Sequence, residues 1–406
     1  VVLRYQYVNN QVLTKTKRMK ILAIDDQKLI LLSVEKRLTD IGYEVQTANS
    51  IESGIQQFNS FKPDLVLLDM NMPEMSGTEL VSCTGTEVVK YIRVFMKNDT
   101  PILVMSGNTD EHLIMQNFDL GVNDYLKKPV SLDEMAARIK RIIGVPENKG
   151  VGTAKKSDTR MLQKNCVGVV IPCYNEEERL LSEEFKQFAH KNLGYHLCFV
   201  NDGSTDNTLS VLKKLKEDNP DNISIYNCKQ NGGKAEAVRQ GVLHLVKDQQ
   251  LDYIGFLDAD LSTDFRDFDD LVKTIESSDF KIVSGSRISR MGADITKESA
   301  RKIISMTINL IIQTILGMPF KDTQCGAKVM DREIASKMFT KKFVTKWLFD
   351  VELFMRMKKY FGKTAVKSMI CEQPLKRWIH ADGSKLSMKD SVKIVGQLAK
   401  ISVHYR

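Results

Sequence analysis

Two successive runs of short apolar segments, each segment ending in polar or acidic residues, constrain the fold of this chain more than any other feature. In the first run the apolar segments are residues 21–24, 64–68, 102–105 and 122–126, and helical periodicity appears at 29–38 and 132–143. Near-continuous apolar strands separated by helices are typical of parallel sheets that helices cover on both faces. The first run therefore predicts a doubly wound α/β domain over residues 19–143.

A second alternation begins at residue 167. Its expected strands are residues 167–171, 196–200, 223–227, 253–257 and 282–285, with helical stretches between them. Residues 144–165 lack apolar periodicity and contain Gly, Pro, Lys and Ser, which indicates a flexible linker. A chain of 406 residues suits two domains of ordinary size. We therefore expect an upstream extension or disordered arm at 1–18 and a second α/β domain at 166–406.

The net charge of +8 is concentrated outside the expected domains. Residues 1–20 carry five basic side chains and no acidic one, and residues 144–165 carry five basic and two acidic ones. The folded parts are then close to neutral, which argues against a nucleic-acid partner. Seven scattered cysteines without a C-x-x-C pair favour reduced thiols, and no secretory signal pattern is present. We expect a cytoplasmic protein.

Polar side chains at the strand ends of the first run suggest phosphoryl chemistry. Three carboxylates, Asp25, Asp26 and Asp69, follow two strands whose carboxyl ends share one edge of the sheet. Three close anions are costly unless a hard divalent cation such as Mg²⁺ lies among them. Ser106 and Lys128 end two further strands and supply a hydroxyl and a cation for phosphate oxygens. The alternative is a set of solvated acids at strand ends, which five matching positions make the poorer explanation.

Residues 19–143 resemble a response-regulator receiver domain with a flavodoxin-like fold. The resemblance implies that Asp69 is the phosphoacceptor and that Asp25, Asp26, Asp69 and the Asn71 carbonyl bind Mg²⁺. It also implies switch roles for Ser106 and Tyr125, a phosphate-pairing role for Lys128, and a sensor histidine kinase or phosphotransfer protein as partner in a two-component phosphorelay.

One departure from the receiver pattern lies between Asp69 and Ser106. Residues 76–81 are nearly repeated as residues 84–89, which lengthens this interval. Gly85 would weaken a helix by about 1 kcal/mol. We therefore expect an extended loop followed by a helix from about Glu87.

The second run carries residues suited to binding a nucleotide diphosphate. Asp258 and Asp260 follow a strand at i and i+2, and that spacing places both carboxylates on one side of a pleat, facing one metal ion. Asp202 can accept from an imide N–H such as that of uracil, and Gly203 permits close approach of the main chain. Lys234 opens a helix after Asn231-Gly-Gly, a plausible diphosphate contact. A lone D-x-D pair is a weak signal, because acids commonly end strands.

Together these segments resemble family-2 glycosyltransferases of GT-A fold, a Rossmann-like architecture, and among them the dolichyl- or polyprenyl-phosphate β-glucosyltransferases. The resemblance rests on residues 172–177, 201–206, 231–234, 258–260, 285–287, 322–328, 349–352 and 383–385, with Arg301 and Trp378. It implies nucleotide-sugar binding by Pro172, Tyr174, Glu176, Asp202, Gly203, Lys234 and Asp258. It implies catalytic roles for Asp260, Asp322, Arg287 and Arg301, with Asp258 and Asp260 holding Mg²⁺ or Mn²⁺. Asn201, Ser262 and Ala327 depart from residues common in the family.

The implied activity is transfer of a sugar, glucose being favoured, from a nucleotide sugar such as UDP-glucose to a polyprenyl phosphate with inversion, regulated by phosphorylation. Two alternatives remain open: a soluble glycosyltransferase acting on a protein or saccharide, and a non-catalytic signalling protein that binds nucleotide sugar. Residues 303–316 form an apolar helical stretch interrupted by polar residues, which indicates a groove or interfacial helix rather than a spanning one. We therefore expect peripheral contact with the inner face of the cytoplasmic membrane.

Overall fold

The computed structural model describes residues 18–72, 74–76, 79–81, 85–107, 111–146, 159–288, 294–295, 299–378 and 388–405. It divides the chain into two compact units, residues 1–159 and 160–406. The expected arm at 1–18 lies outside the described residues except for Arg18, and so does most of the expected linker. The linker prediction was too long at its C-terminal end, because strand β9 already begins at Met161.

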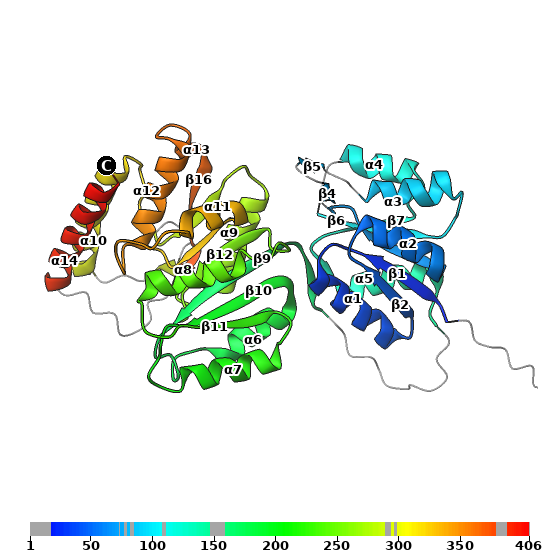
Figure 1. The fold of residues 1–406 in the computed structure, drawn as a ribbon, viewed down its shortest axis with the longest axis horizontal. Helices are drawn as coiled ribbons and strands as arrows, with labels where there is room; N and C mark the ends of the chain where they lie inside the picture. The colour runs from blue at the N-terminus through cyan, green and yellow to red at the C-terminus, as the bar shows by residue number, and fades with distance from the viewer. Residues whose placement is uncertain are drawn as a thin grey trace, which may run out of the picture. The chain divides into compact units, whose positions relative to one another are not determined.

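The N-terminal unit alternates strands and helices (Figure 1). Its elements are β1 (Lys20–Ile24), α1 (Lys28–Ile41), β2 (Glu44–Ala48), α2 (Ile51–Phe61), β3 (Leu65–Asp69), β4 (Glu74–Ser76), β5 (Glu79–Val81), α3 (Thr86–Lys90), the π-helical turn η1 (Tyr91–Phe95), β6 (Ile102–Ser106), α4 (Glu111–Asp119), β7 (Asp124–Lys127), β8 (Val130–Ser131) and α5 (Leu132–Ile143).

The sheet of this unit has the order β2-β1-β3-β6-β7 with parallel pairing throughout, which confirms the doubly wound prediction. Alternate residues of its central strands, such as Leu22 and Leu68, pack against α2, α3 and η1. The residues between them, such as Ile21 and Leu67, are also fully buried. Burial on both faces explains why these strands read as continuous apolar runs.

The repeated segment between Asp69 and Ser106 forms more structure than the expected extended loop. Strands β4 and β5 pair as a short antiparallel ribbon before α3 begins at Thr86. Gly85 lies at the start of α3, where its amide donates to the carbonyl of Met70 (3.1 Å). A Cβ at Gly85 would lie 2.5 Å from the Asp69 carbonyl oxygen, so a side chain there would push against the backbone of the predicted phosphoacceptor.

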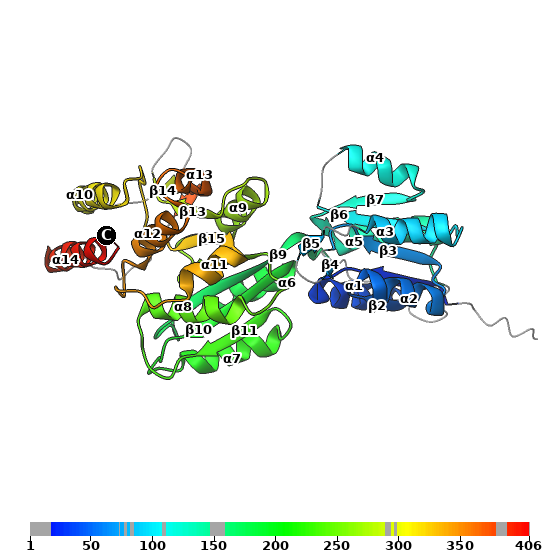
Figure 2. The same cartoon turned by 45° about the horizontal axis from the view of Figure 1, so that its top comes forward.

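The C-terminal unit also consists of a sheet covered by helices (Figures 1 and 2). Its strands are β9 (Met161–Cys173), β10 (Asn192–Asn201), β11 (Ile223–Asn227), β12 (Tyr253–Leu257), β13 (Ile282–Ser286), β14 (Asp294–Ile295), β15 (Ala327–Asp331), β16 (Ile370–Pro374) and β17 (Arg377–Trp378). Its helices are α6 (Ser182–Lys191), α7 (Thr208–Asp218), α8 (Lys234–Leu245), α9 (Phe265–Glu276), α10 (Ser299–Leu316), α11 (Arg332–Phe339), α12 (Phe349–Phe361), α13 (Val366–Met369) and α14 (Met388–His404).

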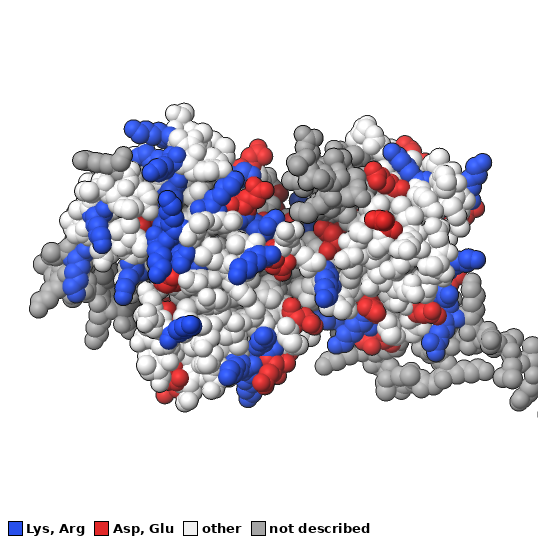
Figure 3. Space-filling model, in the orientation of Figure 1, with Lys and Arg blue, Asp and Glu red and all other residues white. Residues whose placement is uncertain are grey.

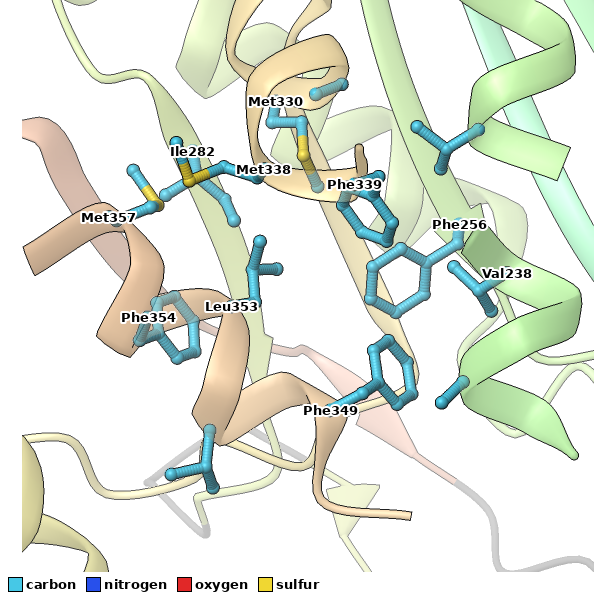
Figure 4. Packing of buried hydrophobic residues seen from close by; sticks show 14 of the residues in the cluster. Val238, Phe256, Ile282, Met330, Met338, Phe339, Phe349, Leu353, Phe354 and Met357 are labelled. Carbon is cyan, nitrogen blue, oxygen red and sulfur yellow. The ribbon is translucent and has the colours of Figure 1, made fainter. Parts of the chain in front are cut away.

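The main sheet of this unit has the order β11-β10-β9-β12-β15-β13-β16. Pairing is parallel except at β15, which runs antiparallel to both β12 and β13. One apolar core lies between the sheet and the helices that include α8, α11 and α12, where Phe256 of β12 packs near Phe349 of α12 (Figure 4). A second core, with Phe185 and Phe199, covers the other face.

The antiparallel strand positions the site. Parallel strands β12 and β13 end at one edge of the sheet, and β15 begins at that edge because it runs the other way, with Leu257 of β12 opposite Ala327 of β15. The segments after β12 and β13 therefore meet the segment before β15.

Helix α10 contains the apolar stretch predicted at 303–316. Ile308, Ile312 and Leu316 on one of its faces are buried in the core, whereas Leu310 is 64% exposed. Side chains at positions 299–307 lie outside the description. Among the described residues, no helix combines the length and hydropathy needed to cross a bilayer.

Candidate functional site

The predicted phosphoacceptor residues of the N-terminal unit converge at the carboxyl edge of its parallel sheet. Asp25 follows β1, Asp69 ends β3, Ser106 ends β6 and Lys128 follows β7, and all four side chains are buried. The Lys128 Nζ lies 3.0 Å from Asp25 Oδ2 and 2.9 Å from Asp69 Oδ2. This geometry joins strand ends that are separated by up to 103 residues in the sequence.

The charges at this edge are strongly coupled. Burial, together with a smaller effect of the neighbouring Asp69 charge, raises the pKa of Asp25 to about 6 despite the attraction of Lys128. Burial alone would lower the pKa of the Lys128 ammonium, but Asp25 and Asp69 together hold it above its usual range. Lys128 is therefore a permanent cation beside two carboxylates.

Three carboxylate oxygens, one from each of Asp25, Asp26 and Asp69, lie within 4.8 Å of one another. Such an all-oxygen cluster matches the ligands that Mg²⁺ prefers, so the donor set fits the predicted ion. The main-chain N–H of Asn71 donates to Asp69 Oδ1 (3.3 Å). Asn71, the fourth residue expected to bind Mg²⁺, therefore lies next to the predicted phosphoacceptor. Tyr125, the predicted switch aromatic, lies half-buried on β7.

In the C-terminal unit the predicted nucleobase residue is closely tied to a neighbouring loop. Asp202 follows β10 and is 2% exposed. Its carboxylate accepts from the amides of Gly232 (2.9 Å) and Gly233 (2.8 Å). Burial raises the pKa of Asp202, against these two amide donors. The amides of Gly232 and Gly233, which belong to the segment expected to contact a diphosphate, thus donate to Asp202.

Gly203 allows this close packing. Its φ of +66° is a left-handed conformation that favours glycine, and a Cβ there would lie 2.6 Å from the Asn231 amide nitrogen. Pro172 is the last residue but one of β9, and Tyr174, just beyond the strand, is 45% exposed. Burial raises the pKa of Glu176, and the negative charge of Asp260 also raises it. The residues expected around a nucleotide therefore come from the segments that end or follow four neighbouring strands, β11, β10, β9 and β12.

The D-x-D pair lies in a turn rather than on a strand. Strand β12 ends at Leu257, Leu261 has a positive φ of 49°, and Asp260 Oδ1 accepts from the Ser262 amide (3.0 Å). The pleat argument for placing both carboxylates on one side was therefore wrong in its premise. Asp258 nonetheless pairs with a cation, because Lys234 Nζ lies 2.5 Å from its Oδ1. Burial lowers the pKa of Lys234, but Asp258, Asp350 and Asp260 raise it overall.

Two of the residues predicted to be catalytic, Arg287 and Asp322, form an ion pair. The Arg287 guanidinium donates from Nε to Asp322 Oδ2 (2.7 Å) and from Nη2 to Asp322 Oδ1 (2.8 Å), and the Arg287 amide also donates to Oδ2 (2.9 Å). Arg287 follows β13 and Asp322 precedes β15, the meeting point that the antiparallel strand creates. The side chain of Arg301, on α10, lies outside the described residues.

Sequence reasoning did not single out three further residues of this site, which are Gly326, Lys328 and Asp350. Gly326 packs on the D-x-D pair, since a Cβ there would lie 1.9 Å from Asp258 Oδ2. Lys328 is fully buried, and its Nζ lies 2.6 Å from Asp350 Oδ1 and donates to the Cys325 carbonyl (2.7 Å). The sequence signal that could have identified Lys328 is its core-facing position on a strand, because a buried lysine requires a buried partner.

Comparison with known proteins gives matches to both units. Residues 21–140 match the family described as response regulator receiver domain, and residues 168–339 match glycosyl transferase family 2. The chain is 31% identical over 254 residues to a dolichyl-phosphate beta-glucosyltransferase of Dictyostelium discoideum, covering 59% of this chain and 74% of that protein. It is 31% identical over 261 residues to that of Saccharomyces cerevisiae, covering 59% of this chain and 75% of the yeast protein.

Solved structures match each unit separately. The chemotaxis protein CheY4 of Vibrio cholerae covers 31% of this chain and 99% of its own, with 29% identity and a TM-score of 0.28. The glucosyl-3-phosphoglycerate synthase of Mycobacterium tuberculosis, in complex with Mn²⁺, UDP and glucosyl-3-phosphoglycerate, covers 59% of this chain and 80% of its own, with 16% identity and a TM-score of 0.44.

Proposed function

Because the chain belongs to the family of glycosyltransferases that includes the dolichyl-phosphate beta-glucosyltransferases, and carries a response regulator receiver domain, we propose that it is a phosphorylation-regulated polyprenyl-phosphate glucosyltransferase. It transfers glucose from UDP-glucose to a polyprenyl phosphate with inversion at the anomeric carbon. The single observation that carries this proposal is the arrangement of two cationic centres, Lys234 and Arg287, at one edge of the sheet.

Lys234 belongs to the donor half of the site. Its ammonium lies beside Asp258, close to the loop that Asp202 holds through Gly232 and Gly233. Asp258 and Asp260 are the residues that would hold Mg²⁺ or Mn²⁺, an ion that would supply Lewis-acid stabilisation of the departing diphosphate. Lys234 would add a fixed positive charge for the same phosphates. We assign Pro172, Tyr174, Glu176 and Gly203 to the surroundings of the nucleotide.

Arg287 belongs to the acceptor half. A phosphate monoester is largely ionised at pH 7, so it needs cations that orient it more than a base that deprotonates it. Asp322 holds the guanidinium of Arg287 through two parallel bonds, which fix the orientation of the cation that we assign to the acceptor phosphate. Arg301 is proposed as a second phosphate-binding cation. Attack by the phosphate on the face opposite the leaving UDP inverts the anomeric carbon.

A lipid acceptor requires contact with a membrane surface. Basic side chains gather over and beside α12 on the face shown in Figure 3. The exposed lysines of α11, α12, α13 and the segments between them are Lys337, Lys341, Lys342, Lys346, Lys359, Lys363 and Lys367. Trp347, 71% exposed, lies beside Lys346 in the sequence. Lysines attract anionic lipids and tryptophan favours the bilayer interface, so this surface supports peripheral binding at the inner face of a cytoplasmic membrane.

The receiver provides the regulatory half of the proposal. Asp69 would accept phosphate from a sensor histidine kinase or phosphotransfer protein, with Mg²⁺ held by Asp25, Asp26, Asp69 and Asn71. Lys128 stabilises the carboxylate and then the phosphoryl oxygens, and Ser106 and Tyr125 respond to the added charge. Phosphorylation then alters transfer through receiver docking or dimerisation.

The test is to supply UDP-glucose with Mg²⁺ or Mn²⁺ and compare a short-chain polyprenyl phosphate with soluble saccharide and protein acceptors, measuring released UDP and glycosylated product. Glucosyl polyprenyl phosphate is the expected product. The partial burial of α10 in the core favours a second candidate, a soluble acceptor, because it reduces the apolar surface left for lipid. Robust transfer to a soluble acceptor with none to polyprenyl phosphate would establish that second candidate.

A further inference from the structure

Glu372 makes more contacts with the acceptor half of the site than its position on a neighbouring strand would suggest. It lies on β16, which pairs in parallel with β13, the strand that leads to Arg287. Its Oε1 accepts from the Ser286 hydroxyl (2.8 Å) and from the Asp322 amide (2.6 Å). Its Oε2 accepts from the Lys321 amide (2.9 Å).

These contacts join the two segments that carry the Arg287–Asp322 pair. Ser286 directly precedes Arg287, and Lys321 directly precedes Asp322. The Asp322 side chain in turn accepts from the Arg287 amide and from two nitrogens of its guanidinium. Glu372 thus fixes the backbone from which Asp322 reaches Arg287, and it does so through charge-assisted bonds, which are stronger than neutral ones.

The donor half of the site is held by other elements. Lys234 comes from α8, Asp258 follows β12 and Asp202 follows β10, and the hydrogen bonds described for these three side chains do not include Glu372. A change at Glu372 can therefore disturb Arg287 and Asp322 while the nucleotide-binding residues keep their partners.

We propose that Glu372 is a positioning residue for acceptor binding, which holds the Asp322 backbone so that Asp322 orients the Arg287 guanidinium toward the acceptor phosphate. The inference rests on the proposed function of Arg287. Glu372 itself does not touch the reacting atoms. Its loss would free the segment before β15 and let the guanidinium rotate away from the orientation that binds phosphate.

Glu372→Gln is the most informative variant, because it keeps the size of the side chain. A glutamine oxygen can still accept from the Asp322 amide, but its NH₂ group would face the Lys321 amide, a second donor. Glu276→Gln is the matched control, since Glu276 is a partly buried glutamate on α9 that accepts from Asn165 (2.9 Å). Ser286→Ala removes one of the Glu372 bonds and should give an intermediate effect.

Steady-state kinetics on the full chain separate a positioning role from a general loss of structure. For Glu372→Gln we expect KM for short-chain polyprenyl phosphate to rise about tenfold, because Arg287 is misoriented. The KM for UDP-glucose and the UDP affinity measured by calorimetry should stay within about twofold of wild type. The Glu276→Gln control should match wild type in all three. Equal losses in donor and acceptor parameters, or an unchanged acceptor KM, would overturn the proposal.

Hydrogen–deuterium exchange supplies a readout that needs no acceptor. In Glu372→Gln the amides of Lys321, Asp322 and Arg287 should exchange faster, whereas those of Gly232 and Gly233 should not. Unchanged exchange at Asp322 would refute the positioning role for any acceptor. If wild type fails to use polyprenyl phosphate while the exchange result holds, the proposed acceptor is wrong and the link between Glu372 and Asp322 stands.

Discussion

The Lys234 ammonium lies 2.5 Å from Asp258 Oδ1, and each side chain is about 30% exposed. The lysine opens helix α8 and the aspartate follows strand β12, so two elements of the fold place a cation against the first carboxylate of the D-x-D pair. The negative charges of Asp350 and Asp260 also raise the pKa of Lys234. The proposed donor site is therefore a mixed cluster of one cation and several carboxylates, in which a divalent metal would bind next to a permanent positive charge.

The first prediction concerns that metal. Changing Asp258 or Asp260 to Asn removes one negative charge from the proposed ligands, and we expect transfer to fall by about a hundredfold or more. UDP affinity should lose most of its dependence on Mn²⁺ concentration, which a calorimetric titration would measure. Asp279→Asn, on an exposed residue, is the control and should behave like wild type. Full activity of Asp258→Asn in excess chelator would contradict the metal role.

The second prediction concerns the receiver. With acetyl phosphate and Mg²⁺, wild type should gain one labile phosphate detectable by intact-mass spectrometry, and Asp69→Asn should gain none. Asp69 is the expected nucleophile because Lys128 lies 2.9 Å from its Oδ2 and can balance the added charge. Asp119→Asn, an exposed carboxylate on α4, should label like wild type. Labelling that persists in Asp69→Asn would place the phosphate elsewhere.

The receiver site could be predicted almost completely from the sequence. Its residues lie at the ends of parallel strands, and the carboxyl ends of parallel strands share one edge of a sheet whatever the lengths of the connections. Asp25, Asp69 and Lys128 therefore lie in contact, as expected. The β4–β5 ribbon was missed because its strands have three residues each, too few for a period-2 pattern to emerge.

The transferase site was predicted less fully, for a reason that lies in strand direction. An antiparallel strand such as β15 brings the residues before it to the catalytic edge, and nothing in the local pattern at 327–331 distinguishes its direction. The packing of Gly326 on Asp258 depends on that direction. The link from Glu372 to Asp322 spans 50 residues and depends on β16 lying beside β13. Long-range pairing of this kind leaves no periodic signal in the sequence.

The third prediction uses the close approach of Gly326 to the D-x-D pair. A Cβ at this position would lie 1.9 Å from Asp258 Oδ2, so Gly326→Ala must displace the carboxylate from Lys234 or shift β15. We expect a loss of transfer comparable with that of Asp258→Asn, together with weaker metal-dependent UDP binding. The matched control is Gly396→Ala in α14, where a Cβ meets no atom within 4 Å. That variant should stay active and gain about 0.5–1 kcal/mol of stability. An active Gly326→Ala enzyme would show that the carboxylate tolerates displacement.

The fourth prediction concerns the buried pair behind the donor site. Lys328 Nζ lies 2.6 Å from Asp350 Oδ1, and both residues are almost wholly inaccessible. Lys328→Met removes the cation in direct contact with the Asp350 carboxylate in the core, and breaking a buried pair in this way costs about 3–5 kcal/mol. Replacing both partners, in Lys328→Met with Asp350→Leu, should restore much of the lost stability, because no buried charge remains. Urea unfolding followed by tryptophan fluorescence reports on this unit, since Trp347 and Trp378 both belong to it.

The pH dependence of the single variant tests the physical cause. Burial already raises the pKa of Asp350, and the positive charge of Lys328 opposes this shift more than that of Lys234 does. Without Lys328 the pKa in the folded state rises further above its unfolded value. Folding then favours the protonated carboxyl, so stability is greatest below the unfolded pKa and falls as the pH rises through the folded one. Lys328→Met should therefore lose less stability relative to wild type at pH 5 than at pH 8. An equal loss at both pH values would mean that the lost contact between the Lys328 ammonium and the Phe256 ring, rather than the bare Asp350 charge, accounts for the destabilisation.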